Sequence, residues 1–278
     1  LFPGVAATCV EIEPAVLRGA AAFDDMNHRP LQSPNLTMIV DDARSFVDGT
    51  RQRFDLVITE PSNPWMPGVA NLFTVEFYRA VRDRLEPGGL IAQWIQTYAL
   101  EPEAYALVLR TLGEVFPHMA LLQVGPGDTL VVASDDEILP DQEELARFAS
   151  DLRTIPAARA DLRRLFGTED PRELMVATFL MDEEALRAWA AEAVGLHTDV
   201  NLRLEYDAPL SLFRQLPGET SRLELELRRR ADSTSLRDLA KRMVPVEASS
   251  SALERRLADF ESWVLEAGGP SAGTVSDN

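Results

Sequence analysis

Residues 54–73 read FDLVITEPSNPWMPGVANLF, and this stretch decides the fold class. Its first part, Phe54–Thr59, is a short apolar run with the composition of a buried β-strand. The polar connection that follows contains prolines, Trp65 and a glycine, which restrict the backbone more than a generic linker does. We therefore predict a strand that ends in the rigid, shaped wall of a binding site.

Further strands and helices alternate on both sides of this stretch. Before it, the runs VAATCVEI at residues 5–12 and LTMIV at residues 36–40 have strand composition, and each is followed by a helix-forming segment. After it, helical spacing over residues 73–85 and a Pro-Gly-Gly turn lead into a strand at residues 90–96. The alternation predicts repeated strand–helix units.

A helix at residues 101–115 and a hairpin at residues 119–134 close the series. Strands that alternate with helices and end in an antiparallel pair indicate a Rossmann-like α/β sheet. In such a sheet the strand with the glycine-rich phosphate loop lies at the centre, and no residue from Leu1 onward supplies it. We expect a sheet that lacks its first strand, in a fragment that is unstable alone or completed by upstream chain.

The texture of the sequence changes near residue 137, where segments rich in Ala, Leu, Glu and Arg begin. We divide the chain into an incomplete Rossmann-like domain at residues 1–136 and a helical extension at residues 137–216, with a short strand expected at residues 202–205. Residues 217–278 are predicted to be a helical tail with a disordered end.

Composition limits the classes of partner. The formal net charge of −18 opposes binding to a phosphate backbone, so we predict no nucleic-acid partner. Cys9 is the only cysteine, and three scattered histidines have no metal-ligand spacing, so we predict no metal and a reducing, cytoplasmic compartment. No stretch approaches the roughly 20 apolar residues of a membrane span, which predicts a soluble chain.

Ligands of open α/β sheets bind at the carboxyl ends of the strands, so polar residues there are the candidates. Glu11 ends the first visible strand, where a carboxylate can accept hydrogen bonds from both ribose hydroxyls or only complement a helix dipole. Asp42 ends the next strand. Either it accepts a hydrogen bond from the adenine amine while Asp41 caps the following helix, or it is itself a plain cap.

The loop after residues 54–59 holds Glu60 and Asn63, and Gln93 and Gln96 end the strand expected beside it. Their positions predict a second group of polar side chains at the same rim of the sheet. Tyr98 follows this strand and either lines the pocket or belongs to the core.

These motifs, taken in series, resemble the spermidine synthase family of aminopropyltransferases. The run is VEIEP, DDARSF, FDLVITEPSNPW, ANLFTVEFY, LEPGG and AQWIQ, and the resemblance covers residues 5–135. The EPSNPW form and HTDVNLRLEYDAPLSLF at residues 197–213 resemble a bacterial branch that is often joined to a membrane-spanning, transporter-like region. The resemblance implies a fold of the S-adenosylmethionine-dependent methyltransferase type.

The family resemblance also implies a reaction, in which an aminopropyl group moves from decarboxylated S-adenosylmethionine to a diamine such as putrescine in polyamine biosynthesis. By residue, Glu11 matches the family's ribose-binding acid, Asp42 with Ala43 beside it matches the adenine site, and Glu60 matches the catalytic acid. Asn63 and Gln96 stand at or near positions where the family holds the amine, and Gln93 and Tyr98 are further substrate-binding candidates at the same rim. The implied assembly is a homodimer, tethered to a membrane where an upstream region provides an anchor.

The sequence departs from the family at the positions that hold the amine. Glu60 is one methylene longer than the family's aspartate, Asn63 replaces a second aspartate, and Gln96 stands near a family glutamate. Without these two negative charges, a dry pocket binds a dication less tightly by roughly several kcal/mol. We therefore expect an acceptor other than putrescine.

Two alternatives to the aminopropyl transferase stay open. SNPW distantly resembles the Asn-Pro-Pro-aromatic loop of amine methylators, which favours an S-adenosylmethionine-dependent N-methyltransferase. The changes at Asn63 and Gln96 also fit a non-catalytic nucleoside-binding domain attached to a membrane transporter-like region.

Overall fold

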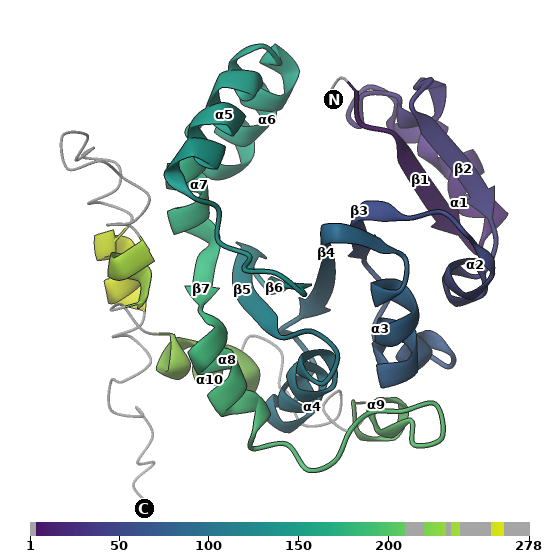
Figure 1. Cartoon of the computed structure of the whole chain (residues 1–278), viewed down its shortest axis with the longest axis vertical. Helices are drawn as coiled ribbons and strands as arrows, with labels where there is room; N and C mark the ends of the chain where they lie inside the picture. Colours follow the sequence, from purple (N-terminus) through teal and green to yellow (C-terminus); the bar gives the residue numbers. More distant parts are fainter. Residues whose placement is uncertain (1–3, 209–219, 232–234, 240–256, 264–278) are drawn as a thin grey trace, which may run out of the picture.

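The computed structural model describes residues 4–208, 220–231, 235–239 and 257–263 (Figure 1). Strands and helices alternate in the first half, which contains β1 (Ala7–Glu11), α1 (Pro14–Ala20), η1 (Ala21–Phe23), η2 (Pro30–Gln32), β2 (Leu36–Val40), α2 (Ala43–Gly49), β3 (Phe54–Thr59), η3 (Val69–Phe73), α3 (Val75–Arg82), β4 (Leu85–Gln96), α4 (Pro102–Gly113), β5 (His118–Gly125) and β6 (Asp128–Ser134). Helices predominate afterwards, in the order α5 (Gln142–Arg153), α6 (Pro156–Phe166), α7 (Pro171–Thr178), β7 (Phe179–Met181), α8 (Glu183–Ala190), α9 (Arg203–Asp207) and α10 (Arg222–Arg230).

The strands form two separate sheets. β1 and β2 pair in parallel, with Glu11 opposite Val40. The second sheet has the order β3-β4-β6-β5-β7, in which β3 and β4 are parallel and the other pairs are antiparallel. Among the described residues, β1 pairs with no strand but β2, and β3 with no strand but β4. The predicted α/β class is confirmed, with the sheet in two pieces.

The hydrophobic core belongs to the five-stranded sheet and the helices packed on it. α4 is buried along most of its length because it lies against both α8 and α10. The ring of Tyr105 on this helix stacks on Trp189 of α8, with 5.0 Å between ring centroids. Ile91, Leu109 and Val131 are fully buried in the same cluster. This core fixes the end of β4 where part of the candidate site lies.

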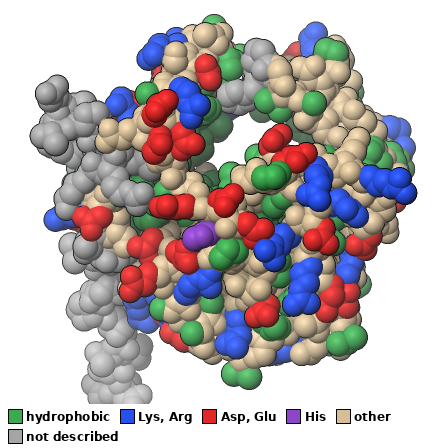
Figure 2. Space-filling view, in the orientation of Figure 1, with side chains coloured by type: hydrophobic (Ala, Val, Ile, Leu, Met, Phe, Trp, Pro, Cys, Tyr) green, Lys and Arg blue, Asp and Glu red, His purple; other side chains and the backbone are tan. Residues whose placement is uncertain are grey.

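The first part of the chain has no such core. No residue from Gly4 to Ile58 is buried, although β1 and β2 have the composition of buried strands. Val40 is 53% exposed, and Leu56 and Ile58 on β3 are 48% and 65% exposed. The space-filling view shows an open hollow between the β1–β2 unit and the helices α5 and α6 (Figure 2). The apolar surface of this unit is therefore in contact with solvent.

Two predicted elements differ from the observed ones. The helix expected over residues 73–85 is shorter, because the Thr74 side chain caps α3 by accepting a hydrogen bond from Phe77 N at 3.2 Å, and Leu85 already begins β4. The strand expected at residues 202–205 is wrong. This segment forms α9, whose Leu204 is fully buried in the cluster that also contains Ala70. The short strand that the structure describes between residues 137 and 208 is β7.

Other expectations concern the ends of the chain and a membrane. α10 lies in the predicted helical tail, and the disordered end predicted for residues 268–278 lies outside the described residues. In the part of the chain that the structure describes, no helix combines the length and apolar character needed to cross a membrane.

Candidate functional site

The two acidic residues predicted to hold a nucleoside lie side by side. Glu11 is the last residue of β1, and its backbone carbonyl accepts a hydrogen bond from Asp41 N at 3.2 Å. Asp42 follows Asp41 in the sequence and is the N-cap of α2. The carboxyl ends of two parallel strands therefore bring Glu11 and Asp42 to one edge of the β1–β2 sheet.

The capping role at this edge belongs to Asp42. Its Oδ1 accepts a hydrogen bond from Ser45 N at 2.8 Å, whereas Asp41 Oδ1 accepts from Asp42 N at 2.8 Å. The suggested division, in which Asp41 caps the helix and leaves Asp42 for the ligand, is therefore wrong. One carboxylate oxygen of Asp42 is thus engaged by the first turn of the helix. Ala43 is the first residue of α2 and is half-buried beside it.

Glu11 and Glu13 also divide their roles. Glu13 caps α1 by accepting a hydrogen bond from Ala15 N at 2.7 Å, and Glu11 Oε1 accepts from Glu13 N at 2.8 Å. The helix cap is therefore Glu13, and the choice for Glu11 between ribose binding and complementing the helix dipole stays a prediction.

The loop after β3 combines buried prolines with an exposed acid. Pro61 and Pro64 are buried, and Trp65 packs against the main core, which holds the loop backbone in place. Asn63 O accepts a hydrogen bond from Met66 N at 3.0 Å, which closes a turn. Glu60 is exposed and forms no ion pair with another described residue. The loop thus presents a carboxylate on a fixed backbone, as a general base requires.

The two glutamines at the end of β4 differ in their surroundings. Gln93 is fully buried, accepts a hydrogen bond from Tyr78 Oη at 3.3 Å and donates to Trp94 O at 2.9 Å. Burial raises the pKa of the Tyr78 phenol, so this hydroxyl stays protonated and donates. Both polar ends of Gln93 therefore already have protein partners.

Gln96 is also fully buried, but neither its Oε1 nor its Nε2 has a hydrogen-bond partner. Leaving a buried amide unsatisfied costs about 1–3 kcal/mol per group, so such groups mark places that a further molecule can complete. Tyr98, two residues beyond, is 45% exposed, so the alternative that it belongs to the core is wrong. Its ring lies beside Gly127, where an added Cβ would come within 3.4 Å of Cδ1.

Sequence reasoning missed Arg44 and Asp199, which connect the two groups of residues. Arg44 is in α2, two residues after Asp42, and its guanidinium binds both carboxylate oxygens of Asp199, at 2.7 and 2.5 Å. The same guanidinium donates to Asn71 O and Thr74 Oγ1, each at 3.3 Å. The hydrogen bond with Asp199 raises the pKa of Arg44 and lowers that of Asp199, so both stay charged. The motif HTDVN was visible in the sequence, but its partner was 155 residues away.

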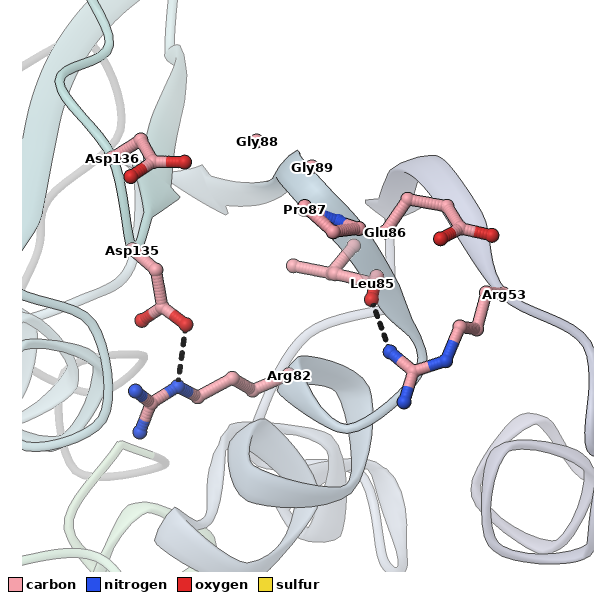
Figure 3. A pocket seen from close by; sticks show the side chains of 9 residues that line it. All are labelled: Arg53, Arg82, Leu85, Glu86, Pro87, Gly88, Gly89, Asp135 and Asp136. Carbon is pink, nitrogen blue, oxygen red and sulfur yellow. Dashed lines mark hydrogen bonds and ion pairs between the residues drawn. The ribbon is translucent and has the colours of Figure 1, made fainter.

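A cavity of about 230 Å³ lies at the opposite end of β4 and contains none of the predicted site residues (Figure 3). Arg82 Nε lies 2.9 Å from Asp135 Oδ2, and Arg53 Nη1 donates to Leu85 O at 2.7 Å. These contacts engage both arginines that line it. Because ligands of α/β sheets bind at the other rim, we do not assign the site to this cavity. In the described ranges, no group of three or more His, Cys, Asp and Glu side chains has a metal-binding arrangement.

Residues 5–125 match the family model of the spermine/spermidine synthase domain. The predicted resemblance to the spermidine synthase family is confirmed. The chain is 32% identical to polyamine aminopropyltransferase 2 of Hyperthermus butylicus over 113 residues, which are 39% of this chain and 37% of the relative. It is 30% identical to the polyamine aminopropyltransferase of Klebsiella pneumoniae subsp. pneumoniae over 142 residues, which are 49% of this chain and 46% of the relative. The chain spans less than half the length of these two relatives.

Among solved structures, a probable spermidine synthase from Corynebacterium glutamicum overlaps 69% of this chain and 63% of its own, with a TM-score of 0.46 and 21% identity. The matched segment ends at Gly125, the last residue of β5. It contains all the predicted site residues: Glu11, Asp42, Ala43, Glu60, Asn63, Gln93, Gln96 and Tyr98. Asp199 lies outside it. The helical region after residue 125 therefore contributes a side chain that contacts the domain from beyond the matched segment.

Proposed function

We propose that this protein transfers an aminopropyl group from decarboxylated S-adenosylmethionine to an amine, in the biosynthesis of polyamines. The observation that carries the proposal is the match of residues 5–125 to the spermine/spermidine synthase domain, with acids at the carboxyl ends of its strands. The relatives named polyamine aminopropyltransferase support the same reaction. The free thiol of Cys9 is exposed, which fits a reducing compartment such as the cytoplasm.

In this proposal the nucleoside lies across the edge formed by β1 and β2. Glu11 accepts hydrogen bonds from the ribose hydroxyls, and the Asp42 oxygen that is not used in capping accepts one from the adenine amine. Ala43 contributes the first turn of α2, where a small side chain leaves room for a planar base. No metal is required, because the sulfonium of the donor is itself the leaving group.

Glu60 is the proposed general base. An alkylammonium has a pKa of about 10.4 and no free lone pair, so it must lose a proton before its nitrogen attacks. The nitrogen then bonds to the carbon next to the sulfonium, the carbon–sulfur bond breaks, and its electron pair stays on sulfur as neutral methylthioadenosine. The fixed loop backbone around Pro61 and Pro64 supports this role, because it holds the carboxylate in one place.

The amides at positions 63 and 96 indicate which kind of amine accepts the aminopropyl group. Asn63 and Gln96 offer hydrogen bonds without charge, which favours an amine with one ammonium group over a dication such as putrescine. The unpaired amide of Gln96 is available to a polar group on that amine.

The test uses the protein in the full length that its gene encodes. It is incubated with decarboxylated S-adenosylmethionine and a panel of monoamines and diamines, and methylthioadenosine is measured by chromatography. We expect release that depends on an amine. No release with any amine would count against the transferase, and S-adenosylhomocysteine formed from S-adenosylmethionine would support methyl transfer instead.

A pair of variants tests the base. Glu60→Gln should reduce kcat by about 10² to 10⁴-fold, because the amide keeps the shape but takes no proton. The matched control is Glu86→Gln, an exposed glutamate at the opposite end of β4, which should leave kcat unchanged. Equal rates for Glu60→Gln and the unaltered protein would exclude Glu60 as the base.

A further inference from the structure

The segment 197–201, in the motif HTDVN, is fixed to the main core by its first residue. His197 is fully buried, and its Nε2 lies 2.8 Å from Ala70 O of η3. His197 N donates to Thr111 Oγ1 of α4 at 3.1 Å, and His197 O accepts from Val75 N of α3 at 3.0 Å. Three different elements of the core therefore determine where this segment lies.

The same segment reaches the nucleoside side through its third residue. Asp199 N donates to Glu76 Oε2 at 3.1 Å, and the Asp199 carboxylate forms a two-pronged ion pair with Arg44 of α2. Paired guanidinium–carboxylate bonds fix the relative orientation of both groups, which a single point-charge contact does not. Because Asp42 caps the helix that carries Arg44, the ion pair also constrains Asp42.

Few other described contacts connect residues 4–50 with the main core. No residue from Gly4 to Thr50 is buried, and the hydrophobic residue of this part that packs against the core is Val47 of α2. Arg84 Nε donates to Val47 O at 3.2 Å, and His28 Nε2 lies 2.8 Å from Asp161 Oδ2. Arg44 differs from both, because it also bonds Asn71 O and Thr74 Oγ1 at the end of the loop that begins at Glu60.

We propose that Asp199 is a positioning residue, which holds Arg44 and hence the Asp42 edge in register with the loop that carries Glu60. This inference rests on the proposed function, since it concerns the alignment of the nucleoside with the base. Asp199 touches neither reactant. Asp199 acts on the distance between the Asp42 edge and the loop that carries Glu60. A misplacement of about 1 Å in such a site costs about 10²-fold in rate.

A distance measurement tests the alignment without any ligand. Cys9, the only cysteine, is exposed on β1, and Met66 in the loop is 46% exposed, so Met66→Cys gives a pair of labelling sites that spans the two parts. Spin labels on this pair report a distance distribution by pulsed electron paramagnetic resonance. Asp199→Asn should broaden the distribution and lower kcat/KM about 10²-fold, and Asp199→Glu should restore most of both.

Asp135→Asn is the matched control, because it removes the Arg82–Asp135 pair at the other end of the sheet by the same substitution. It should change neither the distribution nor the rate. An unchanged distribution in Asp199→Asn, or equal broadening in the control, overturns the proposal, and broadening without a loss of turnover overturns the role of Asp199 in the site.

Failure of the proposed function is distinguishable, because the unaltered protein would then release no methylthioadenosine while the distance distribution still responds to Asp199. If Asp199→Asn does not fold, Arg44→Lys removes the two-pronged geometry and keeps the charge. It should broaden the distribution in the same way, and a narrow distribution in Arg44→Lys would contradict the proposal.

Discussion

Residues 4–50, which contain β1 and β2, and the five-stranded sheet differ in packing although their strands have the same apolar composition. The first part has no buried residue, whereas β4, β6 and α4 are buried along most of their length. Parallel strands of this composition are normally covered on both faces. An apolar strand sequence therefore does not guarantee burial, because burial depends on a second layer that other residues must supply.

This difference matters for the site, because the proposed roles are split between the two parts. Glu11 and Asp42 stand on the part without a core, and Glu60 and Gln96 stand at the edge of the part with one. Regions with few buried apolar contacts open at low free energy. The side of the site proposed to hold the nucleoside is thus expected to be more mobile than the side that carries the proposed base.

Hydrogen exchange gives the largest expected contrast. Amides of β4 and β6, in the middle of the five-stranded sheet, should exchange about 10³-fold more slowly than those of β1 and β2, a difference of about 4 kcal/mol in opening free energy. Exchange followed by NMR or mass spectrometry measures this directly. Equal protection of the two sheets, after correction for intrinsic rates, would show that they unfold as one unit.

A truncation in the main core should have the next largest effect. Ile91 on β4 is fully buried and belongs to the main cluster, so Ile91→Ala removes packed atoms and leaves a cavity. We expect the free energy of unfolding to fall by about 3 kcal/mol, measured by urea denaturation. A loss below about 1 kcal/mol would mean that the core around β4 repacks easily, and the contrast with the first part would weaken.

The pH dependence of stability should report on the segment that connects the two parts. Burial lowers the pKa of His197, and Arg203 adds to this, while the Ala70 carbonyl, Asp199 and Glu76 act in the opposite direction. The folded protein therefore favours the neutral imidazole. The contribution of the neutral His197 to the free energy of unfolding is complete above the pKa of the unfolded state, about 6.5. It is lost as the pH falls from there through the pKa of the folded state, with a slope of at most about 1.4 kcal/mol per pH unit.

Denaturation curves between pH 7.5 and pH 5 measure this slope. His197→Gln removes the titrating group, so its curve should lack that component even if the variant is less stable throughout. Asp199 does not contribute to the slope between pH 7.5 and pH 5, because its pKa is lowered below its ordinary acidic value. A slope that is the same with and without His197 would contradict the assignment.

The sequence predicted the local elements well and the long-range contacts poorly. The strands at β2 and β3 and the hairpin β5–β6 follow from runs of apolar residues bounded by turns, which are local signals. Glu11, Asp42 and Glu60 were chosen because each stands at the end of a strand or within two residues after it, and their roles remain predictions. Asp199 could not be assigned, because its contact with Arg44 depends on how chain segments 155 residues apart pack together. For the same reason residues 202–205, with strand-like composition, form a helix against η3.

The smallest expected effect on stability comes from truncating an exposed isoleucine on β3, which compares directly with the buried Ile91 on β4. Ile58 on β3 lies opposite Ala92 in the register next to the Val57–Ile91 pair, and it is 65% exposed. Ile58→Ala is thus the same substitution as Ile91→Ala, on the neighbouring strand, but with little contact to lose. In residues 1–278 we expect a change within about 0.5 kcal/mol by urea denaturation. A loss of about 2 kcal/mol or more in a longer form of the protein would show that another segment covers this face of β3, because only a packed isoleucine has that much to lose.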